Sequence, residues 1–386
     1  MKLNKNKGIT LVALVITIVI LLILAGISIS ALTQTGIFGK AKQAEQRSKE
    51  AQEEENATLG TYENEIDKYV GKNNGNNESN EKKTVADNIG KVLSTEKNIE
   101  LQDIKGNKIV VPAGFKIVSD GTTSNAQTVD KGIVVEDTTG TATNGSQFVW
   151  VPVGTITKAD GTTTTINLDR YTFDTNGNET AQGENVVDTY YSETASKGNT
   201  VAKSITDFKS SVATNGGYYI GRYEARTVTE RNNEKNPLTQ ITVKKTDPVY
   251  NYVTQIQAAS QSQNMYDNTH PFTSDLINSY AWDTATLFAQ SCGTNSKYSR
   301  QHRLSTSYSS TGTTEDVQCN IFDMASNIVE WTTETSSYSG DHCVYRGGVF
   351  FSSYFYTSYR DGISTSDSSI ISDSDSVIGF RSLLYL

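Results

Sequence analysis

Cysteine and histidine are the side chains of this 386-residue chain that could supply a nucleophile, a general base or a metal ligand. The cysteines, Cys292, Cys319 and Cys343, lack the paired spacing of a zinc site and are too few for a disulfide scaffold. One disulfide with one free thiol could form, and the sequence leaves the pair open. The histidines show no H-x-x-x-H spacing, and the sequence has no G-x-S-x-G elbow or phosphate loop. A Ser-His-Asp triad assembled in three dimensions stays open, but no local pattern predicts one.

Oxygen ligands for Ca²⁺ are present in one short segment, as Asp323, Asn327 and Glu330. The alternative is that these side chains cap and brace a turn beneath Trp331. We prefer the second interpretation and therefore expect no cofactor, with structural Ca²⁺ as the remaining alternative.

The segment that follows Glu334 contains no Lys, Glu, Gln, Met or Trp, although the rest of the chain uses all five types. Randomising the two adenines of an Asn codon yields every amino acid except these five. The segment therefore resembles the variable end of a protein diversified by a retroelement, whose reverse transcriptase miscopies adenines of a template repeat into the target gene. This resemblance implies a variable region at residues 349–378.

Aromatic rings alternate with Ser and Asp in this variable region, as they do in antibody paratopes. So many apolar groups cannot all be buried, so we expect several to form an exposed patch on loops held by a fixed core. The alternative is an ordinary Ser- and Tyr-rich tail in which some of these side chains belong to the core. The predicted ligand-binding residues are Phe350, Phe351, Ser353, Tyr354, Phe355, Tyr356, Tyr359, Asp361, Ile363, Asp367, Ser369, Ile370, Ile371, Asp373 and Asp375.

The N-terminus begins with lysines and continues almost wholly apolar over residues 9–32, which is long enough to cross a bilayer as a helix. A small residue, Gly8, precedes the apolar run, whereas a secretory signal has its small residues after it. Residues 7–11, KGITL, resemble the type IV prepilin signal. The resemblance implies a leader at 1–8, cleavage by a prepilin peptidase between Gly8 and Ile9, and a transmembrane and spine helix at 9–70.

Prepilins usually carry Glu at the fifth mature position, and this chain has Ala13 there. The missing Glu fits a subunit at a filament tip, because such a subunit has no neighbour above it whose N-terminal amine the Glu would neutralise. A plain membrane anchor that never polymerises is the alternative. Residues 71–83 are rich in Gly, Asn and charge and predict a flexible linker.

Short β-branched and aromatic runs dominate from residue 84 onward. Strands are predicted within 107–118, 131–137, 146–154 and 216–226, and a helix over 273–292 with a cap at Thr273 or Ser274. We therefore expect an α+β fold, with a β-rich accessory region at 84–146 and a second domain at 147–386.

Five motifs in the second domain, FVWVPVG, GGYYIGRYEAR, NIFDMASNIVEWTTE, YRGG and GFR, resemble in their order the sulfatase-modifying-factor family. That family has a C-type-lectin-like fold and includes the formylglycine-generating enzymes. Their copper-binding cysteines would fall near Ser352 and Thr357, where hydroxyls cannot replace thiolates. We therefore expect no enzyme, and we place Arg346, Arg360 and Arg381 in the fixed frame.

The net charge of −9 and the pI near 5.0 argue against a nucleic-acid partner. We expect a single-pass protein of the cell membrane and cell surface, at a pilus tip or elsewhere, with its C-terminal domain extracellular. Its expected partners are the membrane through residues 9–32, other pilin subunits, and an unidentified protein or cell-surface ligand. A structural minor pilin or pseudopilin with a fixed lectin-like domain is the alternative, and a formylglycine-generating-type oxidase is a weaker one.

Overall fold

The computed structural model describes residues 84–119, 128–139, 142–183, 191–192, 202–233, 235–336, 342–364 and 376–386. The leader, the spine helix, the linker and the processing site at Gly8 and Ile9 lie outside these ranges. Within them, no helix combines the length and the apolar character needed to cross a membrane. The described residues belong to one compact unit.

The larger sheet of this unit has six strands in the order β12-β19-β11-β5-β4-β3, and all its neighbours are antiparallel. Its centre is rich in Val, Ile, Tyr and Trp side chains, which favour the pleated, buried surface of a sheet. The strands are β3 (Phe115–Val118), β4 (Val134–Asp137), β5 (Gln147–Pro152), β11 (Gly217–Gly221), β12 (Thr273–Leu276) and β19 (Ser382–Tyr385).

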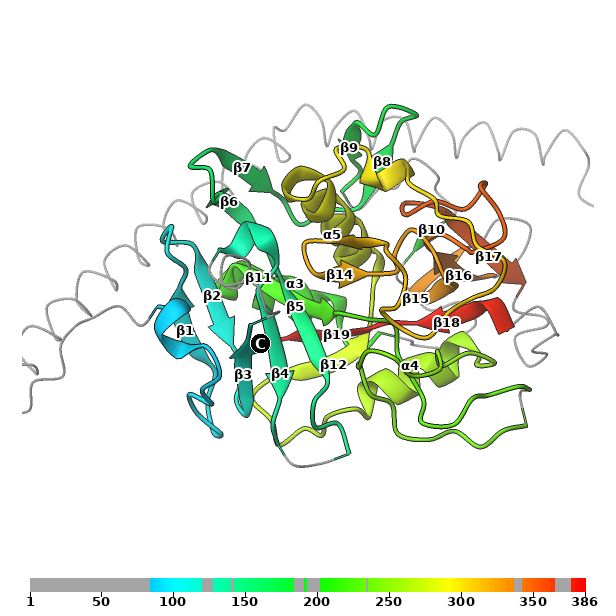
Figure 1. The fold of residues 1–386 in the computed structure, drawn as a ribbon, viewed down its shortest axis with the longest axis horizontal. Coiled ribbons are helices and arrows are strands. Elements are labelled where there is room, and N and C mark those ends of the chain that lie inside the picture. Colours follow the sequence, from blue (N-terminus) through cyan, green and yellow to red (C-terminus); the bar gives the residue numbers. More distant parts are fainter. Residues whose placement is uncertain are drawn as a thin grey trace, which may run out of the picture. The chain divides into compact units, whose positions relative to one another are not determined.

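The smaller sheet runs in the order β10-β15-β16-β17, with β18 parallel to β15. In Figure 1 the red C-terminal segment passes from β18, beside the orange strands, into β19 in the larger sheet. The C-terminal segment therefore joins the two sheets. The strands are β10 (Tyr191–Ser192), β15 (Val329–Ser336), β16 (His342–Arg346), β17 (Arg360–Ser364) and β18 (Ile378–Phe380).

In the described residues, four antiparallel hairpins lie outside the two sheets: β1–β2, β6–β7, β8–β9 and β13–β14. Their strands are β1 (Ile99–Gln102), β2 (Lys108–Val111), β6 (Gly154–Thr157), β7 (Thr163–Ile166), β8 (Tyr171–Phe173), β9 (Glu179–Ala181), β13 (Val317–Gln318) and β14 (Ile321–Phe322). Short 3₁₀ turns occur at η1 (Ala86–Asn88), η2 (Val129–Lys131) and η4 (Tyr298–Arg300).

Three α-helices lie in the described part of the chain: α3 (Ile205–Asn215), α4 (Gln255–Gln263) and α5 (Ser279–Cys292). Each begins at a residue whose side chain accepts a hydrogen bond from the first helical turn: Ser204, Thr254 and Asn278. Helix α5 is buried except at Gln290 and Ser291, which are half-buried. It is therefore a core helix, and any charge that it carries must find a partner inside the protein.

The structure confirms a β-rich domain with few helices, and the predicted runs contain β2, β3, β4, β5 and β11. The predicted start of the helix was wrong. Residues 273–276 form strand β12, and α5 begins after Asn278. These four residues pair with β19, so sheet pairing to a distant strand overrides the local helical spacing. Strands β3 and β4 of the predicted accessory region pair into the same sheet as β5 and β11.

Burial of Asp275 on β12 gives stability a specific pH dependence. Its carboxylate accepts bonds from the amides of Lys203 and Leu276 and from Gln263, but burial outweighs these bonds and raises its pKa from 3.8 to about 6. Because the folded state holds this proton more tightly, the contribution to stability is full below pH 4 and is lost as the pH rises through 6. Relative to Asp275→Asn, the wild-type free energy of unfolding should fall by about 2.5 kcal/mol between pH 4 and pH 7.

Urea unfolding at a series of pH values measures this difference. Asp160→Asn serves as a control, because Asp160 is exposed and its bond with Thr162 lowers its pKa. The Asp160 comparison should therefore show no loss of wild-type stability with rising pH. A wild-type curve parallel to that of Asp275→Asn would contradict the prediction.

Candidate ligand-binding surface

Aromatic side chains gather on the loop of residues 347–359, which connects β16 to β17. At the tip of the loop, Phe351 and Tyr354 are 56% and 81% exposed. The remaining rings are half-buried and lie beside each other. We define the aromatic surface as Tyr308, Phe350, Phe351, Tyr354, Phe355, Tyr356 and Tyr359.

Ring contacts run through the aromatic surface in series. The centroid distances are 6.1 Å for Tyr308–Phe350, 5.1 Å for Phe350–Phe351, 6.5 Å for Phe351–Phe355, 4.5 Å for Phe355–Tyr359 and 5.6 Å for Tyr356–Tyr359. At one end the guanidinium of Arg300 lies 3.6 Å from the ring centroid of Tyr356. Contacts of this kind fix the orientation of the six rings that take part in them, so this part of the surface presents rigid apolar area.

The loop is attached to the neighbouring segment 299–305 through backbone groups. The amides of Thr357 and Ser358 donate to the carbonyls of Gln301 and Ser299 at 3.0 and 2.9 Å. The carbonyl of Phe350 accepts from the amide of Ser305 at 2.8 Å. Both ends of the loop are thereby held, and the residues between them form the tip.

Further attachments hold the loop from below. The indole N–H of Trp282 on α5 donates to the carbonyl of Thr357 at 2.9 Å. The amide of Phe350 donates to the carbonyl of Asn327 at 3.0 Å, and Arg346 donates from Nε to the carbonyl of Tyr359 at 2.9 Å. Trp282, Asn327 and Arg346 are buried, so these bonds attach the loop directly to the core.

Under the loop lies a buried group of ion-paired side chains that we call the base cluster: Arg170, Asp283, Glu334, Arg346 and Arg360. Asp283 pairs with Arg346 through one oxygen and with Arg360 through the other, the latter at 2.9 Å. Glu334 accepts from Arg360 at 2.9 Å and from Arg170 at 3.2 Å. The two carboxylates thus join α5, β15, β16 and β17 at the foot of the loop.

The two guanidiniums that flank the loop have opposite pKa shifts. Burial lowers the pKa of Arg346, and the neighbouring charge of Arg360 lowers it further. Burial acts in the same direction on Arg360, but the charges of Glu334 and Asp283 outweigh it and raise the pKa of that guanidinium. Both side chains are charged at physiological pH, so each carboxylate keeps a cationic partner.

Two glycines follow Arg346 because the backbone there packs against the core. Gly347 has a φ of +94°, and a Cβ on it would lie 3.1 Å from the ring of Trp282. A Cβ on Gly348 would lie 2.1 Å from the carbonyl oxygen of Ala325. The RGG sequence therefore attaches the start of the loop to the core. Arg346 joins the base cluster, and Gly347 and Gly348 allow the backbone to pack closely.

Arg381 also forms a buried ion pair, at the point where β18 passes into β19. Its side chain is fully buried, donates to both oxygens of Glu330 at 2.6 and 3.0 Å, and also reaches the carbonyls of Gly221 and Phe322. One guanidinium therefore joins the C-terminal segment, β15 and β11. Such bidentate, fully bonded geometry is what a buried arginine requires.

The three candidate Ca²⁺ ligands have protein partners. Asp323 accepts from the amide of Gly312 at 2.7 Å and from Thr314 at 2.5 Å, and Asn327 bridges the amide of Ser309 and Glu224. Both oxygens of Glu330 bond Arg381. Among the described residues, no group of three His, Cys, Asp or Glu side chains is arranged to hold a metal ion.

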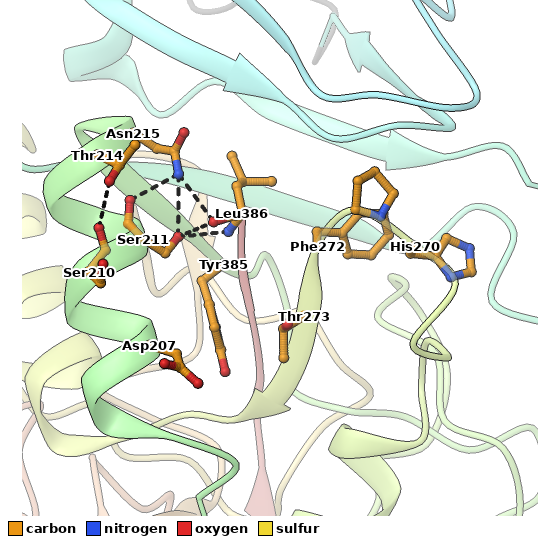
Figure 2. A pocket seen from close by; sticks show the side chains of 11 residues that line it. Asp207, Ser210, Ser211, Thr214, Asn215, His270, Phe272, Thr273, Tyr385 and Leu386 are labelled. Carbon is orange, nitrogen blue, oxygen red and sulfur yellow. Dashed lines mark hydrogen bonds between the residues drawn. The ribbon is translucent and has the colours of Figure 1, made fainter.

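A cavity of about 420 Å³ lies between α3, the segment before β12 and the end of β19 (Figure 2). Ser211 donates from its hydroxyl to the carbonyl of Leu386 and accepts from the Leu386 amide, so it serves to hold the end of β19. His270 pairs with Asp267 at 2.9 Å and lies across the cavity from Ser210 and Ser211 (Figure 2). Figure 2 therefore shows no Ser-His contact that could serve as a nucleophile and its base.

The structure brings together the predicted residues from Phe350 to Asp361. Ser353 is exposed at the tip, and Asp361 on β17 accepts from the hydroxyl of Tyr359 at 2.9 Å. Ile363 lies in β17 opposite Cys343 of β16, within a sheet and not on the loop. The predicted residues Asp367, Ser369, Ile370, Ile371, Asp373 and Asp375 lie outside the described part of the chain.

The prediction missed the residues that support and border the loop. Asp283 and Glu334 hold its arginines, and Arg300 and Tyr308 extend its aromatic surface. One signal was available, because Asp283 is the single charged residue of the mostly apolar run 276–292 and a buried carboxylate needs a cationic partner. No sequence signal pointed to Arg300 or Tyr308.

The fold and this surface define a β-rich domain that presents an aromatic loop on an ion-paired base. Comparisons with protein families, curated proteins and solved structures gave no match. Function must therefore be inferred from the surface itself.

Proposed function

We propose that the chain is a ligand-binding protein of the cell surface and that the aromatic surface is its binding site. The observation that carries this proposal is the tip of the loop, where Phe351 and Tyr354 are exposed to solvent while the backbone on both sides is bonded to the core. Exposed aromatic side chains on a held backbone bind partners with little loss of conformational entropy. The packing of the fold does not account for a ring that is 81% exposed, as that of Tyr354 is.

The proposal extends to the anchor and to the origin of the loop sequence. The resemblance of residues 7–11 to prepilins supports a membrane-anchored, pilin-like subunit, and the motif order supports a C-type-lectin-like fold. The restricted amino-acid types after Glu334 support diversification by a retroelement. In this proposal the protein is a non-enzymatic receptor or adhesin whose partner differs from one copy of the gene to another.

Sequencing the 3′ end of the gene from many cells of one population tests the diversification. We expect substitutions at the exposed tip, at Ser353 and Tyr354 among other positions, and none at Arg346, Gly348 or Arg360. Substitutions should be confined to codons whose template repeat has adenine. An invariant 3′ end without a template repeat would contradict diversification and would leave a fixed lectin-like subunit.

Replacing Phe351 and Tyr354 together by Ala should abolish binding with only a small effect on the fold. Tyr354 is 81% exposed, and Phe351 is 56% exposed but contacts Phe350 and Phe355, so the melting temperature should fall by no more than about 3 °C. Aromatic anchors of an interface contribute about 2 kcal/mol or more to binding. We expect adhesion of cells displaying the full chain to fall at least about 30-fold on the target surface that the wild type binds best. Surface display, adhesion counts and thermal unfolding measure these effects.

The matched control is Val228→Ala. Val228 is 82% exposed and lies outside the aromatic surface, so its loss removes exposed apolar area without touching the loop. Adhesion of this variant should equal that of wild type. Unchanged adhesion by the Phe351/Tyr354 double variant, with the protein folded on the surface, would refute the binding site.

A further inference from the structure

A second cavity, of about 580 Å³, has two of the three cysteines in its wall. Cys292 is buried at the last position of α5, and Cys319 is half-buried in the turn between β13 and β14. Cys343 lies in β16 between β15 and β17 and takes no part in the wall of this cavity. All three are free thiols in the structure.

The turn that carries Cys319 has an uncommon backbone conformation. Its two central residues, Cys319 and Asn320, have φ angles of +46° and +64°, as in a type I′ turn. Asn is favoured at such positions, but Cys is not, because its Cβ crowds the backbone there. The turn is nevertheless firmly held, since Asn320 donates to the carbonyls of Lys131 and Gly132 at 3.2 and 2.8 Å. Strain at Cys319 persists although the turn is well bonded, which indicates that the cysteine side chain has a function.

The chain beside Cys292 is in direct contact with the chain beside Cys319. The amide of Thr294 donates to the side-chain oxygen of Gln318 at 2.7 Å, and a Cβ on Gly293 would lie 2.2 Å from the same oxygen. The residues after Cys292 therefore touch the residue before Cys319. The two thiols also share charged neighbours: Asp130 raises the pKa of both, and Lys131 lowers it.

We propose that Cys292 and Cys319 form a disulfide under oxidising conditions, with Cys343 remaining a free thiol. A low-molecular-weight disulfide such as oxidised glutathione is the oxidant. One cysteine thiolate attacks it and releases one glutathione thiolate, and the second cysteine thiolate then displaces the other glutathione from the mixed disulfide. Two cysteine thiols lose two electrons, one S–S bond forms in the protein and one is broken in the oxidant, and the two protons end on two molecules of glutathione.

The bridge would close a ring of chain that borders the aromatic surface. The residues between the two cysteines include Ser299, Gln301 and Ser305, which bond the loop, and Arg300 and Tyr308, which contact its rings. A disulfide across positions 292 and 319 limits the freedom of this whole segment in the unfolded chain. It therefore stabilises the support of the loop without using any residue of the loop.

The environment of the thiols determines when the bridge can form. Burial raises the pKa of Cys292 to about 12, and burial with the neighbouring Cys292 raises the pKa of Cys319 well above its ordinary value. The folded protein thus holds few thiolates at neutral pH, and exchange proceeds through the thiolate. The bridge should form during folding and form only slowly in the reduced protein once it is folded.

Peptide mapping without reductant identifies the bridge. The full-length chain, refolded in detergent with reduced and oxidised glutathione, is alkylated and digested with trypsin and a Glu-specific protease. Cleavage at Lys245 and Lys297 isolates Cys292, and cleavage at Glu315 and Glu330 separates Cys319 from Cys343. We expect a linked pair of peptides, 246–297 with 316–330, and an alkylated Cys343.

Thermal unfolding with and without dithiothreitol gives a second readout, with Cys343→Ser as the matched control. Reduction should lower the melting temperature of the wild type and of Cys343→Ser by about 5 °C or more, and should leave Cys292→Ser and Cys319→Ser unchanged. Alkylated Cys292 and Cys319 in the oxidised sample, or a bridge that includes Cys343, would overturn the proposal. Neither outcome depends on whether the aromatic surface binds a ligand.

Discussion

Arg346→Ala is expected to lower the free energy of unfolding by about 3–5 kcal/mol, because it removes one member of a buried ion-paired group. Asp283 loses one of its two guanidinium partners, and the carbonyls of Tyr359 and Ser358 lose a charged donor. Asp283 is fully buried, so water cannot replace the arginine beside it. Because Arg346 holds the end of the loop, binding should fall together with stability. Urea unfolding and the adhesion assay measure the two effects.

Arg303→Ala is the control for this prediction. Arg303 forms an ion pair with Glu315, but the side chains are 40% and 85% exposed, so solvent screens the pair. Exposed pairs of this kind contribute little, so the free energy of unfolding should change by less than about 1 kcal/mol. Equal effects of the two substitutions would show that the base cluster contributes no more than a surface pair.

Gly348→Ala should have the second largest effect, of about 3 kcal/mol, through a single added methyl group. The new Cβ would lie 2.1 Å from the carbonyl oxygen of Ala325 and 2.8 Å from the amide nitrogen of Ser326, both of them backbone atoms that cannot turn aside. The loop must therefore move away from the core, and the bond from the Gly348 amide to the carbonyl of Met324 should break. Hydrogen exchange of the Phe350, Thr357 and Ser358 amides would measure the detachment.

Gly90→Ala is a suitable comparison, since its Cβ would meet no atom within 4 Å. Its φ of +79° makes alanine unfavourable there, but only by about 1 kcal/mol. Exchange at the loop amides should remain slow in this variant. Rapid exchange in both variants, or in neither, would contradict the role assigned to Gly348.

Patterns of neighbouring residues were sufficient to predict strands β3, β4, β5 and β11, because alternation and β-branched side chains are local signals. They failed at residues 273–276, where pairing with β19 decides the structure. The predicted aromatic residues of the loop include the two most exposed rings, Phe351 and Tyr354. That part of the site follows from composition alone, since one short stretch holds more apolar groups than a sheet can cover.

The support of the loop could not be derived from the sequence. Arg346 and its partner Asp283 are 63 residues apart, and Arg170 and Glu334 are 164 residues apart. Which carboxylate meets which arginine depends on how the two sheets and α5 come together, and no local pattern carries that information. The same holds for Tyr308 and Arg300, whose contact with the loop depends on the path of the segment between α5 and β13.

The attachments of the loop use its main chain: the amides of Phe350, Thr357 and Ser358 and the carbonyls of Phe350, Thr357 and Tyr359. A peptide group is the same whichever side chain accompanies it, so the identity of the exposed tip residues Ser353 and Tyr354 is nearly independent of folding stability. Under the proposed function, selection acts on these positions for recognition alone. A population of cells can then explore many residues there without losing copies to misfolding.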